Sequence, residues 1–300
     1  MRMTERVDVC ICTYRRASVV ETLRSVAAQR LPDGIRVRAV VSDNDDTASA
    51  RAVVLAAASA LGLDCRYVHA PARNISVARN AALDSADAAL LAFIDDDEVA
   101  TPCWITSLLE RRRATGAPIV FGPVQAVYGD GPAWLRQADL HSIRPVFRPG
   151  GVIDTGYTCN VLLDRAAMTS EMRAWRFDPA LGRSGGEDTL YFYRLHELGA
   201  SIAYAEAALV HEAVPPHRAR LAWLLKRSFR SGQTHGRVLL TAQGRKPTLI
   251  AIAAAKCAYC TVGMLLRAPS PALWRSLAVR AALHAGVVSR LAGISDLELY

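Results

Sequence analysis

The sequence predicts an α/β fold on a parallel sheet, followed by a basic C-terminal helical region. In residues 1–214, short apolar runs of strand length alternate with amphipathic runs of helix length, an order typical of parallel sheets. Three of the apolar runs end in polar residues, near Thr13, Asp43 and Asp95. Because ligands bind at the carboxyl ends of such strands, we expect these polar residues to form one site.

The individual elements follow from local patterns. Expected strands span 7–12, 35–41, 65–69, 90–94, 119–127 and 156–163, with extended pieces at 201–205 and 208–211. Expected helices span 19–29, 48–61 and 189–198. Asn74 or Ser76 opens another expected helix, which runs through Ala86, and Pro102 opens a further one. Ser18 is the expected cap of the first helix, and Pro32-Asp33-Gly34 is a turn. Residues 128–155, which are rich in Gly and Pro, form a long loop, and such loops are usually functional.

Composition and charge divide the chain in two. Of its 300 residues, 51% are hydrophobic and 21% are charged, which excludes a disordered chain. Residues 215–300 hold 13 Lys and Arg against two acidic residues, a balance of +11, so the net charge of +8 leaves −3 for residues 1–214. We therefore expect a nearly neutral domain over 1–214 and a basic helical tail over 215–300.

The basic tail and the cysteines indicate the surroundings of the protein. A basic tail suits an anionic membrane surface or nucleic acid. Aromatic residues make up only 7% and show no RNA-recognition pattern, so we expect a membrane surface and no nucleic acid. The seven Cys predict reduced thiols, and the N-terminus runs into a strand without an apolar signal segment. We expect a cytoplasmic protein, peripheral on the inner face of the cell membrane.

Four acidic residues, Asp95-Asp96-Asp97-Glu98, directly follow the apolar strand at 90–94. Adjacent carboxylates repel each other unless a cation or hydrogen-bond donors compensate them. Mg²⁺ and Mn²⁺ prefer hard oxygen ligands and often share them with substrate phosphates. A solvated acidic turn is the simpler alternative, but the other polar strand ends favour a metal site.

A second acidic pair, Glu187-Asp188, follows Gly185-Gly186 at the start of an expected helix. The simpler interpretation is capping of the first helical turn. However, a metal site with a separate carboxylate is what displacement at a phosphate-activated carbon requires. The metal neutralises the leaving diphosphate, and the carboxylate takes the proton of the attacking hydroxyl.

Taken in order, these motifs resemble the family 2 glycosyltransferases of GT-A fold, which invert the anomeric centre of a nucleotide sugar. The resemblance covers about Val7 to His211. It rests on residues 12–16, 40–44, 74 with 78–80, 93–97, 186–188 and 210–211. The finer likeness is to bacterial exopolysaccharide enzymes of the succinoglycan type, which add a sugar to a lipid-linked oligosaccharide. The resemblance implies a mostly parallel mixed sheet, Mn²⁺ or Mg²⁺, a nucleotide-diphosphate sugar donor and a saccharide or lipid-linked saccharide acceptor.

The resemblance also implies roles for single residues. The donor and its nucleotide would be held by Thr13, Arg15, Asp43, Asn74, Arg79, Asp95 and Asp96, the metal by Asp97 and His211, and catalysis would use Asp188 as base with Glu187 orienting hydroxyls. Many relatives carry Asn in place of Arg15 and Gly-Ser in place of Asp45-Asp46. Because these positions would lie near the base, the nucleotide stays unassigned.

The tail predicts helices at 219–231, 247–266 and 272–292. Lys256 interrupts the apolar middle stretch, and a central Lys in a membrane span costs roughly 2.5–3.5 kcal/mol. Helices lying on anionic lipid and helices packed on the domain are both open alternatives. Cys257 and Cys260 have redox-motif spacing but lie within a helix, so we interpret them as packing residues.

Two other functions compete with a glycosyltransferase. A nucleotidyltransferase also uses a nucleotide, a metal and an α/β sheet, but it ordinarily has a Gly-rich phosphate loop after the first strand, where this chain has residues 13–16. A non-catalytic protein that binds a nucleotide sugar or a membrane surface is the other alternative. The intact Asp97 and Asp188 argue against it.

Overall fold

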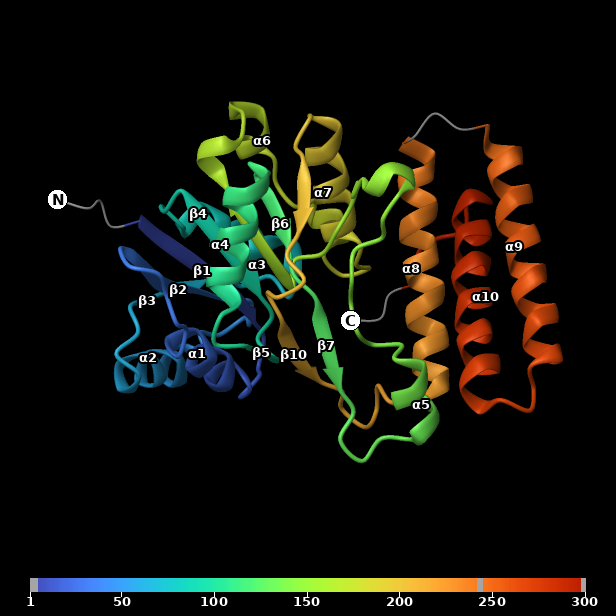
Figure 1. The fold of residues 1–300 in the computed structure, drawn as a ribbon, viewed down its shortest axis with the longest axis horizontal. Coiled ribbons are helices and arrows are strands. Elements are labelled where there is room, and N and C mark those ends of the chain that lie inside the picture. Colours follow the sequence, from blue (N-terminus) through green and yellow to red (C-terminus); the bar gives the residue numbers. More distant parts are fainter. Residues whose placement is uncertain (1–4, 242–244, 298–300) are drawn as a thin grey trace. The chain divides into compact units, whose positions relative to one another are not determined.

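The computed structural model in Figure 1 describes residues 5–241 and 245–297. Its chain divides into two compact units. The first, here called the sheet unit, comprises Met1–Gln125, Ile143–Gly182 and Glu187–Glu212. The second, the helical unit, comprises Ala126–Ser142, Arg183–Gly186 and Ala213–Tyr300. The boundary predicted at residue 214 falls next to the start of the longest segment of the helical unit, while two shorter segments of that unit come from earlier in the chain.

Strands and helices alternate along the sheet unit (Figure 1). In chain order they are β1 (Glu5–Thr13), α1 (Val19–Ala27), β2 (Ile35–Asp43), α2 (Arg51–Ala60), β3 (Cys65–His69), α3 (Ile75–Ser85), β4 (Leu90–Ile94), β5 (Glu98–Ala100), α4 (Trp104–Thr115), β6 (Ile119–Phe121), β7 (Val124–Val127), β8 (Asn160–Asp164), α6 (Ser170–Ala174), α7 (Glu187–Glu197), β9 (Ile202–Tyr204) and β10 (Val210–Ala213). The alternation that the sequence predicted is therefore confirmed.

Seven strands form one sheet in the order β3-β2-β1-β4-β8-β6-β9. Neighbouring strands are parallel except at β8, which is antiparallel to both β4 and β6. The sheet is thus mixed and mostly parallel, as the resemblance implied. In a smaller sheet, β5 pairs antiparallel with β10 and sets His211 opposite Val99.

Helices cover both faces of the large sheet. Val7, Val9 and Ile11 of β1 share a cluster of buried side chains with α1, α2 and α4. Cys10, which points the other way, belongs to the cluster with α3 and α7. Because successive strand residues alternate between faces, a strand buried on both sides is a continuous apolar run in the sequence. This is why the central strands could be predicted from hydropathy alone.

Two strand predictions were wrong in their bounds. The run 119–127 is two strands, β6 and β7, divided at Gly122-Pro123. Asn160 explains the break, because its side-chain amide donates to the carbonyl oxygens of Pro123 at 2.9 Å and Ala208 at 2.7 Å. The next strand begins at Asn160 and not at residue 156, and Gly156 packs directly against the ring of Phe121.

The helical unit contains α5 (Ala133–Ala138), α8 (Leu221–Thr241), α9 (Lys246–Leu266) and α10 (Pro271–Leu291). Helix α5 lies inside the long loop expected at 128–155, and α8 runs ten residues past the end predicted at 231. Cys260 is buried in α9, and the Cys257 sulfur lies 3.5 Å from the Ala281 carbonyl oxygen of α10. Both cysteines therefore pack between helices, as predicted.

The first helix of the sheet unit, α1, has Ser18 at its N-cap, but the Ser18 side chain makes no capping bond.

Candidate active site

The acidic run meets the end of β1. Asp96, only 5% exposed, accepts a hydrogen bond from Thr13 Oγ1 at 2.7 Å. Arg16 contacts Asp96 at 3.2 Å and also pairs with Asp97. Because β1 and β4 are parallel neighbours, the residues that follow them lie side by side. The strand-end site predicted from the sequence thus has a physical basis in the sheet.

The carboxyls of this run are only partly compensated. Burial, aided by Asp97 and Asp95, raises the pKa of Asp96 to about 7 against the opposing effects of Arg16 and Thr13. Glu98 is also buried, and its pKa is raised by burial and by Asp95. Its Oε2 accepts the Asp95 backbone N–H at 2.8 Å. Glu98 therefore braces the turn that presents the acidic side chains.

The donor atoms near this run fit a divalent cation that also binds substrate phosphates. Mg²⁺ typically takes only one or two protein carboxylates and completes its coordination with phosphates and water. Asp97 supplies a partly exposed carboxylate beside β5. His211, in the strand paired with β5, has a buried Nδ1 without a hydrogen-bond partner in the described chain. Within residues 5–241 and 245–297, no three His, Cys, Asp or Glu side chains cluster as a metal site, so the protein's share would be small.

Glu187 and Arg79 form a buried ion pair between α7 and α3. Their exposures are 5% and 7%. Burial lowers the pKa of the Arg79 guanidinium, but Glu187, Asp188 and Asp95 outweigh it and raise that pKa. Burial likewise raises the pKa of Glu187, against the effect of Arg79. Arg79 is thus fixed among three carboxylates, and its guanidinium also lies 5.7 Å from the Phe177 ring centroid.

Asp188 differs from its neighbour because it is only half-buried. Its Oδ1 accepts the Thr189 backbone N–H at 2.7 Å. Asp188 also lies close enough to Asp95 to raise the pKa of that group, after the larger effects of burial, Arg79, Asp97 and Arg16. The two acidic groups, about ninety residues apart in sequence, therefore converge around Arg79.

Two predicted donor-binding residues hold the local backbone. The carboxylate of Asp43, which is fully buried, accepts from the Asp45 N–H at 3.0 Å, the Ala50 N–H at 2.9 Å and the Tyr67 hydroxyl at 2.6 Å. Asn74 caps α3 by accepting from the Val77 N–H at 3.2 Å, and it donates to the Pro179 carbonyl at 2.8 Å. Both residues shape the loops beside the site.

Arg15 and Asp45, two departures from the family's usual pattern, contact each other. Arg15 Nε donates to Asp45 Oδ1 at 3.0 Å, and this bond holds the pKa of Asp45 below its usual range. Arg15 has a left-handed backbone, with φ of 54°. In the sequence the two residues are separate departures from the family's pattern, whereas in the structure they form one ion pair.

Arg16 is the site residue that the sequence analysis did not assign. Its contacts with Asp96 and Asp97 make it a cationic partner of the acidic run. Burial lowers the pKa of Arg16, but these two carboxylates outweigh that effect and raise it. Its position in the sequence could have identified it, because Arg16 lies three residues after the end of β1, a strand that neighbours β4.

Comparisons with known proteins agree on the family and the fold. The family model "Glycosyl transferase family 2" matches residues 8–169. The succinoglycan biosynthesis protein ExoM of Rhizobium meliloti (strain 1021) is 49% identical over 300 residues, which cover 99% of this chain and 96% of that protein. The crystal structure of S. aureus TarS 1-349 is similar with a TM-score of 0.55, 15% identity, and coverage of 92% of this chain and 90% of that one. TarS 1-349 in complex with UDP-GlcNAc is similar to the same degree, at 12% identity. At identities this low, the structural similarity shows a common fold and nothing further.

Proposed function

The chain belongs to the family 2 glycosyltransferases, and from this premise we propose that it moves a sugar from a nucleotide-diphosphate sugar to a hydroxyl of a lipid-linked saccharide, with inversion and with the help of a divalent cation. The family shows a glycosyltransferase, and the succinoglycan relative supports a role in exopolysaccharide biosynthesis. The donor, the cation and the acceptor are the proposed part.

The observation that carries the proposal is the convergence of two acidic groups around Arg79. An inverting displacement needs opposite charges on two sides of the reacting carbon. Cations stabilise the leaving diphosphate, and a carboxylate takes the proton of the incoming hydroxyl. The site has carboxylates suited to a cation at residues 95–97 and a separate carboxylate at Asp188.

Asp188 is the better base of the acidic pair. Glu187 is buried and committed to Arg79, so its carboxylate cannot readily reach a proton outside the protein core. Asp188 is half-buried, and its Oδ1 is already oriented by the Thr189 N–H. We assign the transferred proton to the Asp188 carboxylate. Glu187 acts by fixing the first turn of α7 through its buried ion pair with Arg79.

Asp97 and His211 would hold the cation, which when bound neutralises charge on the leaving diphosphate. Arg16, already beside Asp97, adds a second positive charge at the same place. Thr13 orients Asp96 through its hydroxyl. The role of these protein groups is to hold the donor's diphosphate on the side away from Asp188.

A lipid-linked acceptor requires the enzyme to work at a membrane, and α9 has a suitable surface. It is the one helix in the described chain that is long and apolar enough to cross a bilayer, and only 17% of its most apolar window is buried. Leu265 and Leu266, 68% and 76% exposed, lie at its end next to Arg267. Because Lys256 sits at its centre, we propose that α9 lies on the anionic inner face of the cell membrane.

The test is a panel of nucleotide sugars with Mn²⁺ or Mg²⁺, followed by release of nucleoside diphosphate. We expect hydrolysis of one donor, loss of that hydrolysis after strong chelation, and a large loss of donor affinity in Asp97→Ala. Asp84→Ala is the matched control, because Asp84 is an exposed carboxylate near the end of α3 that pairs with Arg176. Activity that survives chelation undiminished would remove the cation from the proposal.

A further inference from the structure

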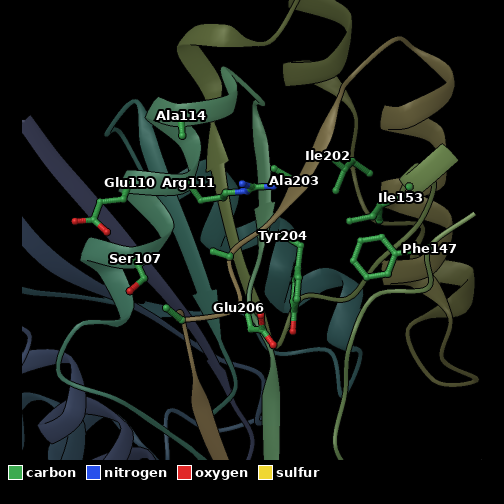
Figure 2. Close-up of a pocket in the computed structure, with 13 residues that line it drawn as sticks. Ser107, Glu110, Arg111, Ala114, Phe147, Ile153, Ile202, Ala203, Tyr204 and Glu206 are labelled. Carbon is green, nitrogen blue, oxygen red and sulfur yellow. The ribbon is translucent and has the colours of Figure 1, made fainter.

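A pocket of about 590 Å³ lies along β9, the edge strand of the large sheet (Figure 2). One wall is α4, which contributes Ser107 and Arg111. The other wall is the loop before β8, which contributes Phe147. Tyr204 and Glu206 come from the end of β9 and the turn that follows it. None of these residues belongs to the acidic site described above.

The lining side chains combine aromatic rings with charged groups. The rings of Tyr204 and Phe147 meet at 79°, with their centroids 5.9 Å apart, and Phe147 is 55% exposed. Figure 2 shows Arg111 extending from α4 toward Ala203, and Glu206 beside Tyr204. A sugar ring matches this mixture, because its C–H face is apolar and its hydroxyls both donate to carboxylates and accept from a guanidinium.

Other ligand classes fit less well. A phosphate or another anion would meet the carboxylates of Glu206 and Glu110 with only Arg111 to compensate them among the lining residues. An extended peptide could add to the free edge of β9, but that strand is only three residues long and offers few backbone hydrogen bonds. A neutral, hydroxyl-rich ligand is therefore favoured.

The register of the sheet relates this pocket to the acidic run. Tyr204 pairs with Phe121, Phe121 with Val161, and Val161 with Phe93. Tyr204 is thus level with Phe93, which lies three strand spacings away across the sheet. Phe93 comes two residues before Asp95 in the sequence. At 4.7–4.9 Å per spacing the separation across the sheet is about 14 Å. Both places are at the same carboxyl edge, and a few linked sugar rings span such a distance.

We propose that this pocket binds sugar units of the acceptor saccharide that lie behind the reacting sugar. The inference rests on the proposed function, since it takes the acceptor to be an oligosaccharide. Tyr204 and Phe147 pack on the face of a sugar ring, while Glu206 and Arg111 bind its hydroxyls. The pocket selects a chain of sugars over a single sugar, because only a chain reaches from the acidic site to β9.

The probe is a set of succinoglycan oligosaccharides, with binding to the full-length protein measured by calorimetry without donor or metal. We expect Tyr204→Ala to weaken binding by about fivefold, because losing an aromatic contact removes on the order of 1 kcal/mol and each 1.4 kcal/mol is tenfold. Tyr204→Phe keeps the ring and should bind like the wild type, whereas Glu206→Gln should weaken binding. Val146→Ala is the matched control, since Val146 is 61% exposed and next to Phe147 but does not line the pocket.

Donor hydrolysis by the same proteins separates this inference from the proposed function. Both Tyr204→Ala and Glu206→Gln should hydrolyse the donor at the wild-type rate, which also shows that they fold. Wild-type affinity for the oligosaccharides in both variants would overturn the pocket assignment and leave the transferase proposal intact. So would a wild-type protein that hydrolyses a donor but binds no oligosaccharide. Oligosaccharide binding without hydrolysis of any donor would instead support the pocket and count against the proposed transfer.

Discussion

At the scale of single residues, neighbouring carboxylates have different surroundings and hence different roles. Glu187 is buried against Arg79, while the next residue, Asp188, is half-buried and oriented by a backbone N–H. A buried ion pair loses much stability when one partner is removed, because the other charge remains without compensation. A partly exposed carboxylate contributes little to stability and can exchange protons. Substitutions at the two positions should therefore give opposite results.

Asp188→Asn should cut kcat by about 10²–10⁴-fold and leave donor affinity near the wild-type value, because general-base catalysis contributes a factor of this size. Calorimetry with the donor and transfer rates with the identified acceptor measure the two quantities. A variant with wild-type kcat would show that Asp188 is not the base.

Glu187→Gln should lower the free energy of unfolding by about 3–5 kcal/mol, since it leaves the Arg79 guanidinium buried without its carboxylate. Urea denaturation of the wild type and the variant gives the difference. The double variant Arg79→Met, Glu187→Leu removes both charges and should recover part of the loss. If Glu187→Gln is as stable as the wild type, the ion pair contributes nothing to the fold.

His141 in the helical unit should make stability depend on pH. Its ring stacks on that of Trp223, with centroids 5.5 Å apart. Burial and the nearby Arg227 lower its pKa to about 4, against the opposing effect of its hydrogen bond with the Arg218 carbonyl oxygen. The unfolded chain binds a proton near pH 6.5, so the free energy of unfolding falls as the pH drops from about 6.5 to 4. The total loss is about 3 kcal/mol.

Denaturation midpoints between pH 7 and 4, followed by Trp fluorescence, measure this effect. His141→Asn should flatten the dependence. His217→Asn is the control, because His217 is exposed and should leave the slope unchanged. An equal slope in the wild type and in His141→Asn would contradict the assignment.

At the scale of elements, α8 and α10 are joined where their glycines face the opposite backbone. A side chain added at Gly286 of α10 would meet the Phe229 carbonyl oxygen, and one added at Gly232 of α8 would meet that of Leu283. Backbone cannot move aside as a flexible side chain can. The close approach of these two helices therefore depends on the missing Cβ atoms at both positions.

Gly286→Ala should destabilise the protein by about 1–3 kcal/mol, the usual cost of adding atoms to a well-packed contact. Thermal unfolding followed by circular dichroism is a sufficient measurement. Gly263→Ala in α9 is the matched control, because its nearest neighbour is the flexible Leu277 side chain at 3.4 Å, and Ala is the better helix former. A lower midpoint in Gly263→Ala than in Gly286→Ala would reject the packing explanation.

At the scale of the whole molecule, charge and exposed apolar surface occur in the same part of the chain. Residues 215–300 carry +11, and α9 within them exposes Tyr259, Val262, Leu265 and Leu266. Exposed apolar residues on a basic background favour an anionic lipid surface over bulk water. The nearly neutral remainder of the chain holds the acidic site. We therefore predict that membrane attachment and chemistry use different parts of the chain.

Full-length protein should bind vesicles that contain anionic lipid, and binding should weaken between 0.1 and 1 M salt as the screening length falls from about 10 to 3 Å. Leu265→Glu with Leu266→Glu should weaken it by at least about a hundredfold, because each buried Leu is worth about 1.5–3 kcal/mol. Val53→Glu, on an exposed position of α2, is the control in the same sedimentation assay. Equal binding by all three proteins would exclude α9 as the attachment surface.

The sequence by itself determined the alternation of the longer strands and helices, the family and the acidic run at the end of β4, but not the short elements β5, α5 and α6. These features are local, because hydropathy with a period of two or 3.6 residues specifies an element and its buried face wherever the element later packs. The predicted strand bounds were wrong at Gly122-Pro123. There β6 ends where the side chain of Asn160, distant in sequence, binds the backbone. The site roles assigned by resemblance remain predictions.

Only the tertiary structure decided which charges meet. Arg79 pairs with Glu187, 108 residues away, and Arg16 contacts Asp97, 81 residues away. The sequence does not show which carboxylate each arginine contacts. That depends on which strand ends and helix starts lie side by side. Sheet order sets that adjacency, and it also places β9, with its pocket, at the edge. Burial then gives the pairs their strength, since a charge removed from water must find its counterpart within the protein.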